Sequence, residues 1–375
     1  MAQYSLQQMT FVLSVLSNGA ASKKGTVSEL EQILSSSINA ALTSSTFTQY
    51  IGTDWSVVWG PIVSQESGSS YADNAMYVAH SPSQNAYVVA IAGTNFLSKF
   101  DVEVEDADVT LVDYQGPAQI ATGTLDGITA LEAMSDPNQG TLLAFLNGLP
   151  DSTQLIFAGH SLGGALAPAL VVDLILKQGL KNSFSNVMTF PTAGPTPGNS
   201  DYALLYQIMF FYQPPFPPWF PPGLGQLRTP KEEADASAPA WQTWNKVIWN
   251  SLDVVPHAWN QLAAIPTIYG DQLPADTCIQ SLVTYATNCI LGSNVFAQLP
   301  NVEVPGFFVL NNADGGTAQF VSEVVAQHIP QYFQMIVPEL AGVLPSPGND
   351  ALIAASLFVK DFCIKHPNGQ CQKTE

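Results

Sequence analysis

A serine between glycines, at a predicted strand-to-helix turn, is the residue of this chain best placed to act as a nucleophile. Ser161 lies in the run GHSLGG over residues 159–164, after the apolar run 155–158 and before the apolar, Ala-rich segment 162–177. A tight turn between strand and helix projects a serine hydroxyl, and flanking glycines let the two elements approach closely. The pattern also occurs by chance in structural glycine turns, but this context predicts a nucleophile.

A serine hydroxyl becomes a nucleophile only when a base removes its proton, and an acid holds that base in place. In hydrolases whose serine lies at a strand-to-helix turn, the three residues follow along the chain in the order Ser, Asp, His. The chain has five histidines, so the choice is short. His80 precedes the serine and His160 lies in the turn itself. His257 lies only a few residues after Asp253, the candidate acid, on the same segment. His366 lies between two cysteines and stays as the alternative. We expect His328, at a predicted loop-to-helix junction late in the chain, to be the base.

The acid should follow a strand upstream of that histidine. Asp253 comes just after the apolar run 247–249 and a short polar break, which is the placement expected of the acid. Asp271 and Asp276 are the alternatives, and both are expected in solvated loops. The sequence therefore predicts that Asp253 orients the imidazole of His328.

When such a serine attacks a carbonyl group, the oxyanion that forms needs two hydrogen-bond donors. One is expected to be the backbone N–H of Leu162, directly after the nucleophile, where the following helix points its positive end. The other should come from the loop after an earlier strand. Thr94 follows the predicted strand 86–92 and offers both an N–H and a hydroxyl.

Together these segments resemble the class 3, or fungal-type, lipases of the α/β-hydrolase superfamily. The resemblance covers about residues 70–335 and runs through five motifs in the family's order: Tyr87–Thr94, Gly159–Gly164, Thr192–Asn199, Asn250–Pro256 and His328–Tyr332. It implies a triad of Ser161, Asp253 and His328, an oxyanion hole at Thr94 and Leu162, and a mobile lid after the strand that ends near Thr94.

Two motifs depart from the family pattern. Ala92 stands where the family usually has an arginine before Gly-Thr, and residues 193–199 read AGPTPGN where GAPRVGN is usual. The segments 201–245 and 257–320 are also longer than expected. The substrate specificity of the family is therefore not carried over to this chain.

Two aromatic segments are expected to contact substrate. Residues 95–102 lie where the family has its lid, and the apolar side chains there are Phe96, Leu97 and Phe100. The proline-rich run 210–223 offers Phe216, Trp219 and Phe220 as an acyl-binding wall or an interfacial contact. The alternative for this run is an arm packed on the body of the protein or on a partner subunit.

The order of predicted elements indicates an α/β fold. Helices are expected over 4–16, 27–41, 126–134, 140–149 and about 162–177, and strands over 55–59, 74–79, 86–92, 155–158, 185–190 and 247–249. This alternation predicts a mostly parallel central sheet with helices on both faces. We expect one α/β-hydrolase domain over 1–375, with a helical segment at about 1–45, an insertion at about 201–245 and a long connection at about 257–320.

Composition narrows the partners. The formal net charge of −19 makes nucleic acid and anionic membranes unsuitable partners, and no apolar run reaches the length of a membrane span. The four cysteines form two close pairs in sequence, Cys278 with Cys289 and Cys363 with Cys371, which favours two local disulfides. Buried free thiols are the alternative. We expect a secreted protein, although no clear signal peptide begins the chain.

These features predict a serine hydrolase that cleaves carboxylic esters through an acyl-serine intermediate, without metal or cofactor. The apolar composition and the aromatic run favour lipid-like acyl esters, most simply triacylglycerols. The alternatives are a phospholipase, a short-chain esterase or a feruloyl-type esterase, which would share the catalytic residues. A non-catalytic lipase-like scaffold is disfavoured because no triad member is missing. The oligomeric state is not indicated by the sequence.

Overall fold

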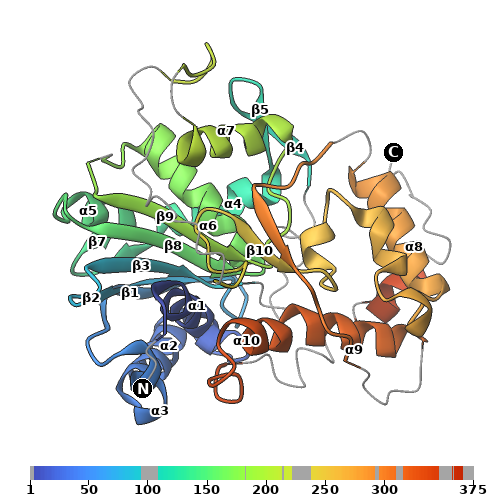
Figure 1. The fold of residues 1–375 in the computed structure, drawn as a ribbon, viewed down its shortest axis with the longest axis horizontal. Helices are drawn as coiled ribbons and strands as arrows, with labels where there is room; N and C mark the ends of the chain where they lie inside the picture. The colour runs from blue at the N-terminus through green and yellow to red at the C-terminus, as the bar shows by residue number, and fades with distance from the viewer. Residues whose placement is uncertain are drawn as a thin grey trace.

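The centre of the protein is a seven-stranded sheet with the order β1-β2-β3-β8-β9-β10-β11 (Figure 1). The computed structural model describes residues 4–93, 109–181, 183–212, 215–221, 238–291, 295–309, 316–345, 357 and 359–365. The sheet strands are β1 (Ser56–Ser64), β2 (Asn74–Ser81), β3 (Ala86–Ile91), β8 (Gln154–His160), β9 (Asn186–Thr192), β10 (Val247–Asn250) and β11 (Asn301–Val304). Two hairpins lie outside it: β4 (Leu111–Gln115) with β5 (Ala118–Ala121), and β6 (Ser135–Asp136) with β7 (Gly140–Thr141).

The sheet is antiparallel at one edge and parallel elsewhere. β1 and β3 pair antiparallel with β2, whereas β3, β8, β9, β10 and β11 pair parallel in that order. The carboxyl ends of these parallel strands therefore meet at one edge, where sites form in α/β sheets. The predicted α/β-hydrolase architecture, a mostly parallel sheet with helices on both faces, is confirmed.

Helices cover both faces of the sheet. The α-helices are α1 (Leu6–Leu16), α2 (Val27–Thr43), α3 (Ser45–Ile51), α4 (Thr122–Ala133), α5 (Leu142–Asn147), α6 (Leu162–Asp173), α7 (Ser200–Phe211), α8 (Thr277–Tyr285), α9 (Gly316–His328) and α10 (Pro330–Ile336). Short turns of 3-10 helix occur at η1 (Ser17–Ala20), η4 (Val255–His257), η5 (Leu262–Thr267) and η6 (Gly270–Gln272), and π-helical turns at η3 (Leu174–Gln178) and η7 (Ala286–Leu291). In Figure 1, α1, α2 and α10 lie below the sheet and α7 lies above it.

Local sequence signals set several of these helix boundaries. Ser5 and Gln8 form a reciprocal capping box at the start of α1, and Thr26 and Glu29 do the same at the start of α2. Asn199 caps α7 by accepting the N–H of Tyr202. These caps satisfy backbone N–H groups that the first turn of a helix leaves without partners.

Alternate side chains of the central strands enter two separate cores. On β8, Ile156 and Ala158 pack with α1, α2 and α10, whereas Leu155 and Phe157 pack with α4, α6 and α7. This alternation follows from the two-residue period of a strand. Because both faces are covered, the middle of β8 is apolar throughout, which is why an uninterrupted apolar run identifies it in the sequence.

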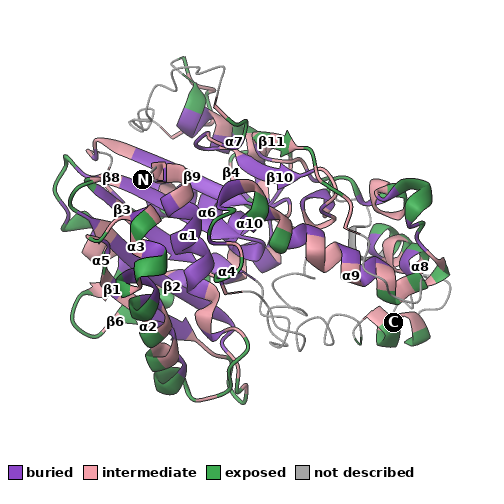
Figure 2. Cartoon of the chain, turned by 60° about the horizontal axis from the view of Figure 1, so that its bottom comes forward, coloured by how far each residue is buried: buried purple, intermediate pink, exposed green. Residues whose placement is uncertain are grey.

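A third, smaller core lies beside the sheet, around α8 and α9. It includes Tyr269, Ile279 and Phe320, with Leu252 and Val254 packed against it. Figure 2 shows α8 and the described C-terminal residues to the right of the sheet and its covering helices. The segment 257–320, expected as a long connection, thus contains α8 and also the edge strand β11.

Candidate active site

Ser161 occupies the turn between β8 and α6 with an unusual backbone conformation. Its φ is 62° and its ψ is −129°. A positive φ is uncommon for a residue with a side chain, and such conformations cost of order 1–3 kcal/mol where the surroundings enforce them. The surroundings here are two crossing backbones: a Cβ on Gly159 would lie 2.1 Å from the carbonyl oxygen of Gly163. The glycines are therefore required for this turn to form.

The side chains of Ser161, His328 and Asp253 form one hydrogen-bonded line. His328 Nδ1 lies 2.9 Å from Asp253 Oδ2, and its Nε2 lies 2.7 Å from Ser161 Oγ. An ionised carboxylate only accepts, so Nδ1 carries the proton and Nε2 is free to accept from the serine hydroxyl. All three residues are buried, and Asp253 is 0% exposed. This arrangement is suited to removing the proton of Ser161.

Asp253 is held by two further donors. The Tyr332 hydroxyl donates to Oδ2 at 2.9 Å, and the N–H of Val255 donates to Oδ1 at 3.0 Å. The same hydroxyl accepts the N–H of Asn250 at 2.9 Å. Burial, and then the negative charge of Asp253, raise the pKa of Tyr332 well above its ordinary value. The phenol therefore stays protonated and continues to donate to the carboxylate.

His160 is hydrogen-bonded to the backbone of His328. The backbone carbonyl oxygen of His328 lies 2.8 Å from His160 Nε2. Because a carbonyl oxygen can only accept a hydrogen bond, Nε2 is the protonated nitrogen. The hydroxyl of Thr192 lies 2.9 Å from Nδ1 and donates to it. Burial, followed by repulsion from His328, lowers the pKa of His160 well below its usual value. His160 is thus a neutral support for the backbone of His328.

From the sequence, His160 is excluded as the base because it lies in the turn. Its position was nevertheless informative, because it continues the alternation of Ile156 and Ala158 along β8. Side chains on that face of β8 point toward α1 and α10. His160 accordingly contacts the rings of Phe11, His328 and Tyr332, at centroid distances of 6.2, 5.0 and 5.0 Å.

A buried polar chain connects the acid loop to the helix that carries His328. His328 is the last residue of α9 and is followed by α10, so the expected loop-to-helix junction is a junction of two helices. Asn250 Nδ2 donates to Gln327 Oε1 at 2.6 Å, and Gln327 Nε2 donates to Glu323 Oε1 at 2.7 Å. The N–H of Val309 also donates to Glu323 Oε1, at 2.8 Å. Nothing in the sequence singled out Gln327 or Glu323.

The alternatives for base and acid have other contacts. Asp276 caps α8 through the N–H of Ile279 and accepts the hydroxyl proton of Thr317. His257 pairs with Gln261 at 3.1 Å. His80 stacks on the ring of Tyr87, with ring centroids 4.0 Å apart. Asp271 lies in η6 and is exposed. His366 lies outside the described residues.

Of the two expected oxyanion donors, Leu162 lies within the described residues and Thr94 does not. Leu162 is the first residue of α6, where a backbone N–H has no acceptor within the helix. Gly163 packs directly on the end of β3, because a Cβ there would lie 2.5 Å from the carbonyl oxygen of Ile91. Thr94 and the expected lid residues Phe96, Leu97 and Phe100 lie outside the described residues.

The described part of the proline–aromatic run packs on the body of the protein. Phe220 is buried in the core on the α6 side of the sheet, and Phe216 and Trp219 pack against that core. Trp219 covers Gly116 in the β4–β5 hairpin, since a Cβ on that glycine would lie 3.2 Å from Trp219 Cβ. These three side chains therefore pack on the body of the protein, and Trp219 does so beside the β4–β5 hairpin.

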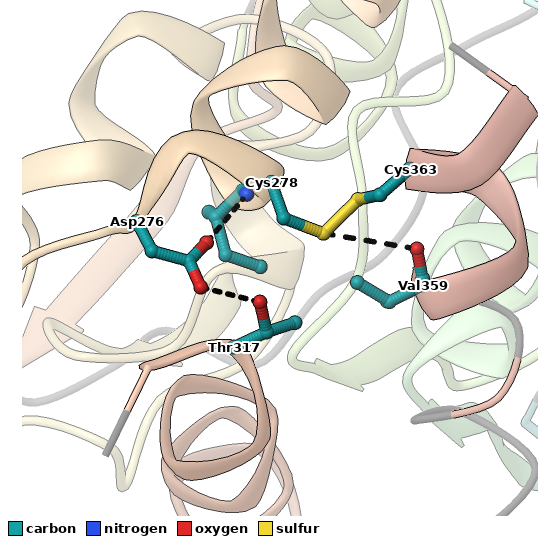
Figure 3. The surroundings of a disulfide bond; sticks show 6 residues. Asp276, Cys278, Thr317, Val359 and Cys363 are labelled. Atoms are coloured by element: carbon teal, nitrogen blue, oxygen red, sulfur yellow. Dashed lines mark hydrogen bonds between the residues drawn. A yellow bond between two sulfur atoms is a disulfide. The ribbon is translucent and has the colours of Figure 1, made fainter. Parts of the chain in front are cut away.

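The expected local disulfides are wrong. Cys278 of α8 is bonded to Cys363 in the helical residues 359–365, across 85 positions of sequence (Figure 3). The reason is tertiary: the C-terminal helix packs beside α8, with Val359 against the small third core. Closeness along the chain carries no information about such contacts. The side chain of Cys289 and all of Cys371 lie outside the described residues.

Two further properties concern the described residues alone. Among them, no group of three or more His, Cys, Asp or Glu side chains is arranged to hold a metal ion. No helix in the described ranges is long and apolar enough to cross a membrane.

The parallel sheet, the strained serine turn and the helices on both faces define an α/β-hydrolase fold. Residues 88–262 match the model of the family described as lipase (class 3). The chain is therefore a carboxylic ester hydrolase of the lipase type. No curated protein matches the chain in sequence.

Solved structures of lipases resemble this one. The crystal structure of M37 lipase aligns with a TM-score of 0.67 and 22% identity, covering 97% of this chain and 99% of the other. That likeness extends the shared fold over nearly the whole chain. The Rhizomucor miehei lipase propeptide complex has a TM-score of 0.42 and 17% identity, covering 68% of this chain and 63% of its own. The lipase from Rhizopus microsporus var. chinensis has the same TM-score and identity, with 69% and 72% covered.

Proposed function

We propose that Ser161 is the nucleophile of a lipase that hydrolyses lipid acyl esters, with His328 as its base and Asp253 as the acid. The observation that carries this proposal is the 2.7 Å contact between Ser161 Oγ and His328 Nε2. It is supported by the hydrogen bond between His328 Nδ1 and Asp253 Oδ2, which keeps the imidazole proton on Nδ1 and leaves Nε2 to accept from the serine.

Acylation follows from this geometry. His328 Nε2 takes the hydroxyl proton as Ser161 Oγ attacks the carbonyl carbon of the ester. The electron pair of the carbonyl moves to its oxygen, where the N–H of Leu162 at the start of α6 can donate. When the tetrahedral intermediate collapses, the bond to the alcohol oxygen breaks and His328 returns the proton to the leaving alcohol. The product is an acyl-serine.

Deacylation repeats these steps with water. His328 Nε2 takes a proton from water while its oxygen attacks the acyl carbon, and the serine oxygen then leaves and regains the proton from His328. The carboxylic acid is released. Asp253 stays ionised throughout and stabilises the imidazolium that forms twice per cycle.

The proposed substrate class is long-chain acyl esters, most simply triacylglycerols. The family match supports an ester of a lipid, and the low charged fraction of 11% is compatible with an apolar ligand. We propose an oil–water interface as the place of action. We also propose secretion, which the Cys278–Cys363 disulfide supports, because disulfides persist mainly in oxidising compartments.

The test is hydrolysis of p-nitrophenyl esters from acetate to palmitate, with and without an emulsion, by wild type and Ser161→Ala. We expect hydrolysis of long chains by the wild type and a loss of at least about a thousandfold in the variant, since a triad acts as a unit. Ser185→Ala is the matched control, because the Ser185 hydroxyl donates to the backbone carbonyls of Ser152 and Thr153, which come just before β8. Full activity of Ser161→Ala would refute the nucleophile, and activity on acetate alone would refute the long-chain substrate class.

A further inference from the structure

We infer that Asn18, in the N-terminal segment, is a positioning residue that fixes the end of β3 against the nucleophile turn. This inference rests on the proposed role of Ser161. Its basis is one hydrogen bond: the N–H of Gly93 donates to Asn18 Oδ1 at 2.9 Å. Asn18 lies in η1, outside residues 88–262 that match the lipase family.

This hydrogen bond gives the N–H of Gly93 an acceptor at the point where the pairing of β3 with its neighbouring strands ends. Parallel pairing of β3 with β8 ends at Ile91 opposite Gly159. The next residue, Ala92, still bonds β2 through the carbonyl of Ala75 at 2.9 Å. Gly93 lies beyond both strands, and a backbone N–H in such a place needs another acceptor. The side-chain amide of Asn18 supplies it.

Gly93 touches the residue proposed to do the chemistry. A Cβ built on Gly93 would lie 2.5 Å from the carbonyl oxygen of His160 and 3.0 Å from Ser161 Cβ. The two backbones are therefore in contact without any side chain between them. A shift of Gly93 would change the wall beside the nucleophile and the direction in which the chain leaves the sheet.

Asn18 itself is held in a rigid place. Its Nδ2 donates to the carbonyl of Val15 at 3.3 Å, which sets the orientation of the amide. The neighbouring Gly19 packs on α2, since a Cβ there would lie 2.9 Å from Ser37 Oγ. Residues of α1 before it, including Phe11 and Val12, are fully buried. The amide thus connects a packed helical layer to the end of β3.

The test compares Asn18→Ala, which removes the acceptor, with Asn18→Asp, which keeps an oxygen in the same place. We expect Asn18→Ala to lower kcat by about tenfold to a hundredfold with KM changed less than about threefold, because small displacements at a reacting centre have effects of this size. We expect Asn18→Asp to recover most of kcat. A role in folding alone would lower the melting temperature of Asn18→Ala without this separation of kcat from KM.

Asn147 offers a matched control. Its Oδ1 accepts the N–H of Lys181 at 2.9 Å and its Nδ2 donates to the carbonyl of Gly179 at 3.3 Å, the same two kinds of bond at the same lengths. Asn147→Ala should keep kcat. If Asn18→Ala does not fold, Asn18→Leu, which has similar volume and no acceptor, takes its place in the comparison.

Each result decides a different proposal. Wild-type kcat in Asn18→Ala or Asn18→Leu, together with an inactive Ser161→Ala, would overturn the role of Asn18 and leave the nucleophile in place. Equal losses in the Ala and Asp variants would also overturn it, because the acceptor oxygen would then not matter. Activity in Ser161→Ala would instead refute the proposed function.

Discussion

The hydroxyl of Tyr332 joins two parts of the candidate site, because it donates to Asp253 and accepts from the backbone of Asn250. It therefore fixes both the carboxylate and the strand end from which the acid loop departs. No other side-chain hydroxyl among the described residues is bonded to that carboxylate.

Replacing Tyr332 by Phe should lower kcat about tenfold and destabilise the fold by about 1–3 kcal/mol, because the N–H of Asn250 loses its acceptor in a buried place. Ester hydrolysis and urea unfolding measure the two effects. The control is Tyr206→Phe, which removes another buried hydroxyl, bonded to Thr189 at 2.6 Å. It should affect stability only. Equal kcat in the two variants would contradict the role given to Tyr332.

At the residue level, the sequence predicts those residues of the site that are identified by their type and by their order along the chain. Ser161, Asp253 and His328 follow from one motif, a required order and a short list of histidines, and the structure brings them within hydrogen-bonding distance. The supporting residues could not be predicted this way. Gln327 and Asn18 act through contacts with segments far along the chain, and no local pattern marks such contacts.

Among the elements, the start of α6 is the one whose position the site depends on most. A Cβ on Gly163 would lie 2.5 Å from the carbonyl oxygen of Ile91 and 2.6 Å from that of Ala92. Both are backbone atoms of the β3 end and cannot move without shifting the strand.

Gly163→Ala should therefore lower kcat by about a hundredfold or more, since α6 would be pushed away from β3 and would carry the Leu162 N–H with it. Gly342→Ala is the control, because a Cβ at that position meets no atom within 4 Å. Both variants are compared by ester hydrolysis and by circular dichroism. An active Gly163→Ala protein would contradict the close packing of α6 on β3.

A pair of carboxyl groups, Glu132 and Asp173, lies between α4 and α6. Burial, and then a hydrogen bond to Asp173 and its negative charge, raise the pKa of Glu132 from 4.5 to about 8. Lys177 opposes this shift, and Gln178 donates to Glu132 at 3.1 Å. Tyr114 donates to Asp173 Oδ1 at 2.7 Å. At neutral pH Glu132 therefore holds a proton that the unfolded chain has released.

The stability from this proton should be complete below the unfolded pKa of 4.5 and lost as pH rises through about 8. We expect the melting temperature of the wild type to fall between pH 5 and pH 9, and that of Glu132→Gln to fall less. Glu29→Gln is the control, because hydrogen bonds from Thr26 lower the pKa of Glu29 and place its effect below pH 4.5. An unchanged slope in Glu132→Gln would contradict this account.

The elements themselves were largely predictable, and the reason is burial. β8 and β3 read as apolar runs because both sheet faces are covered, and α1 and α2 begin at capping boxes. β11 was missed because its exposure alternates along an edge strand of four residues, NVEV, which gives too short a signal. The partner of Cys278 could not be predicted, because it depends on how the C-terminal helix packs.

At the scale of the whole molecule, the small third core connects the C-terminal part of the chain to the acid. The Cys278–Cys363 disulfide fixes α8 to the C-terminal helix, and Thr317 at the start of α9 donates to Asp276 at the start of α8 (Figure 3). Leu252 and Val254, on either side of Asp253, pack against the same core. The stability of this core therefore bears on the geometry of the triad.

Removing the disulfide by Cys278→Ser should destabilise the protein by about 2–4 kcal/mol, as is typical for a crosslink closing a long loop. The loss of activity on heating should then begin at a lower temperature than in the wild type. The double variant Cys278→Ser/Cys363→Ser should be no less stable than the single one, since the two sulfurs act as one unit. Urea unfolding of reduced and oxidised protein measures the same difference. Equal stability of wild type and single variant would contradict this.

The separation of the triad along the chain has a consequence for synthesis. Ser161 lies 167 positions before His328, and the strands on both sides of its turn, β3 and β9, also precede that histidine by a wide margin. On a ribosome, the nucleophile turn can fold while the α9 helix has not yet been made. If Ser161 and His328 act as proposed, a nascent chain of this kind carries the serine without its base and should not hydrolyse esters. Hydrolytic activity is then expected only after α9 has docked, so the onset of activity would report that step.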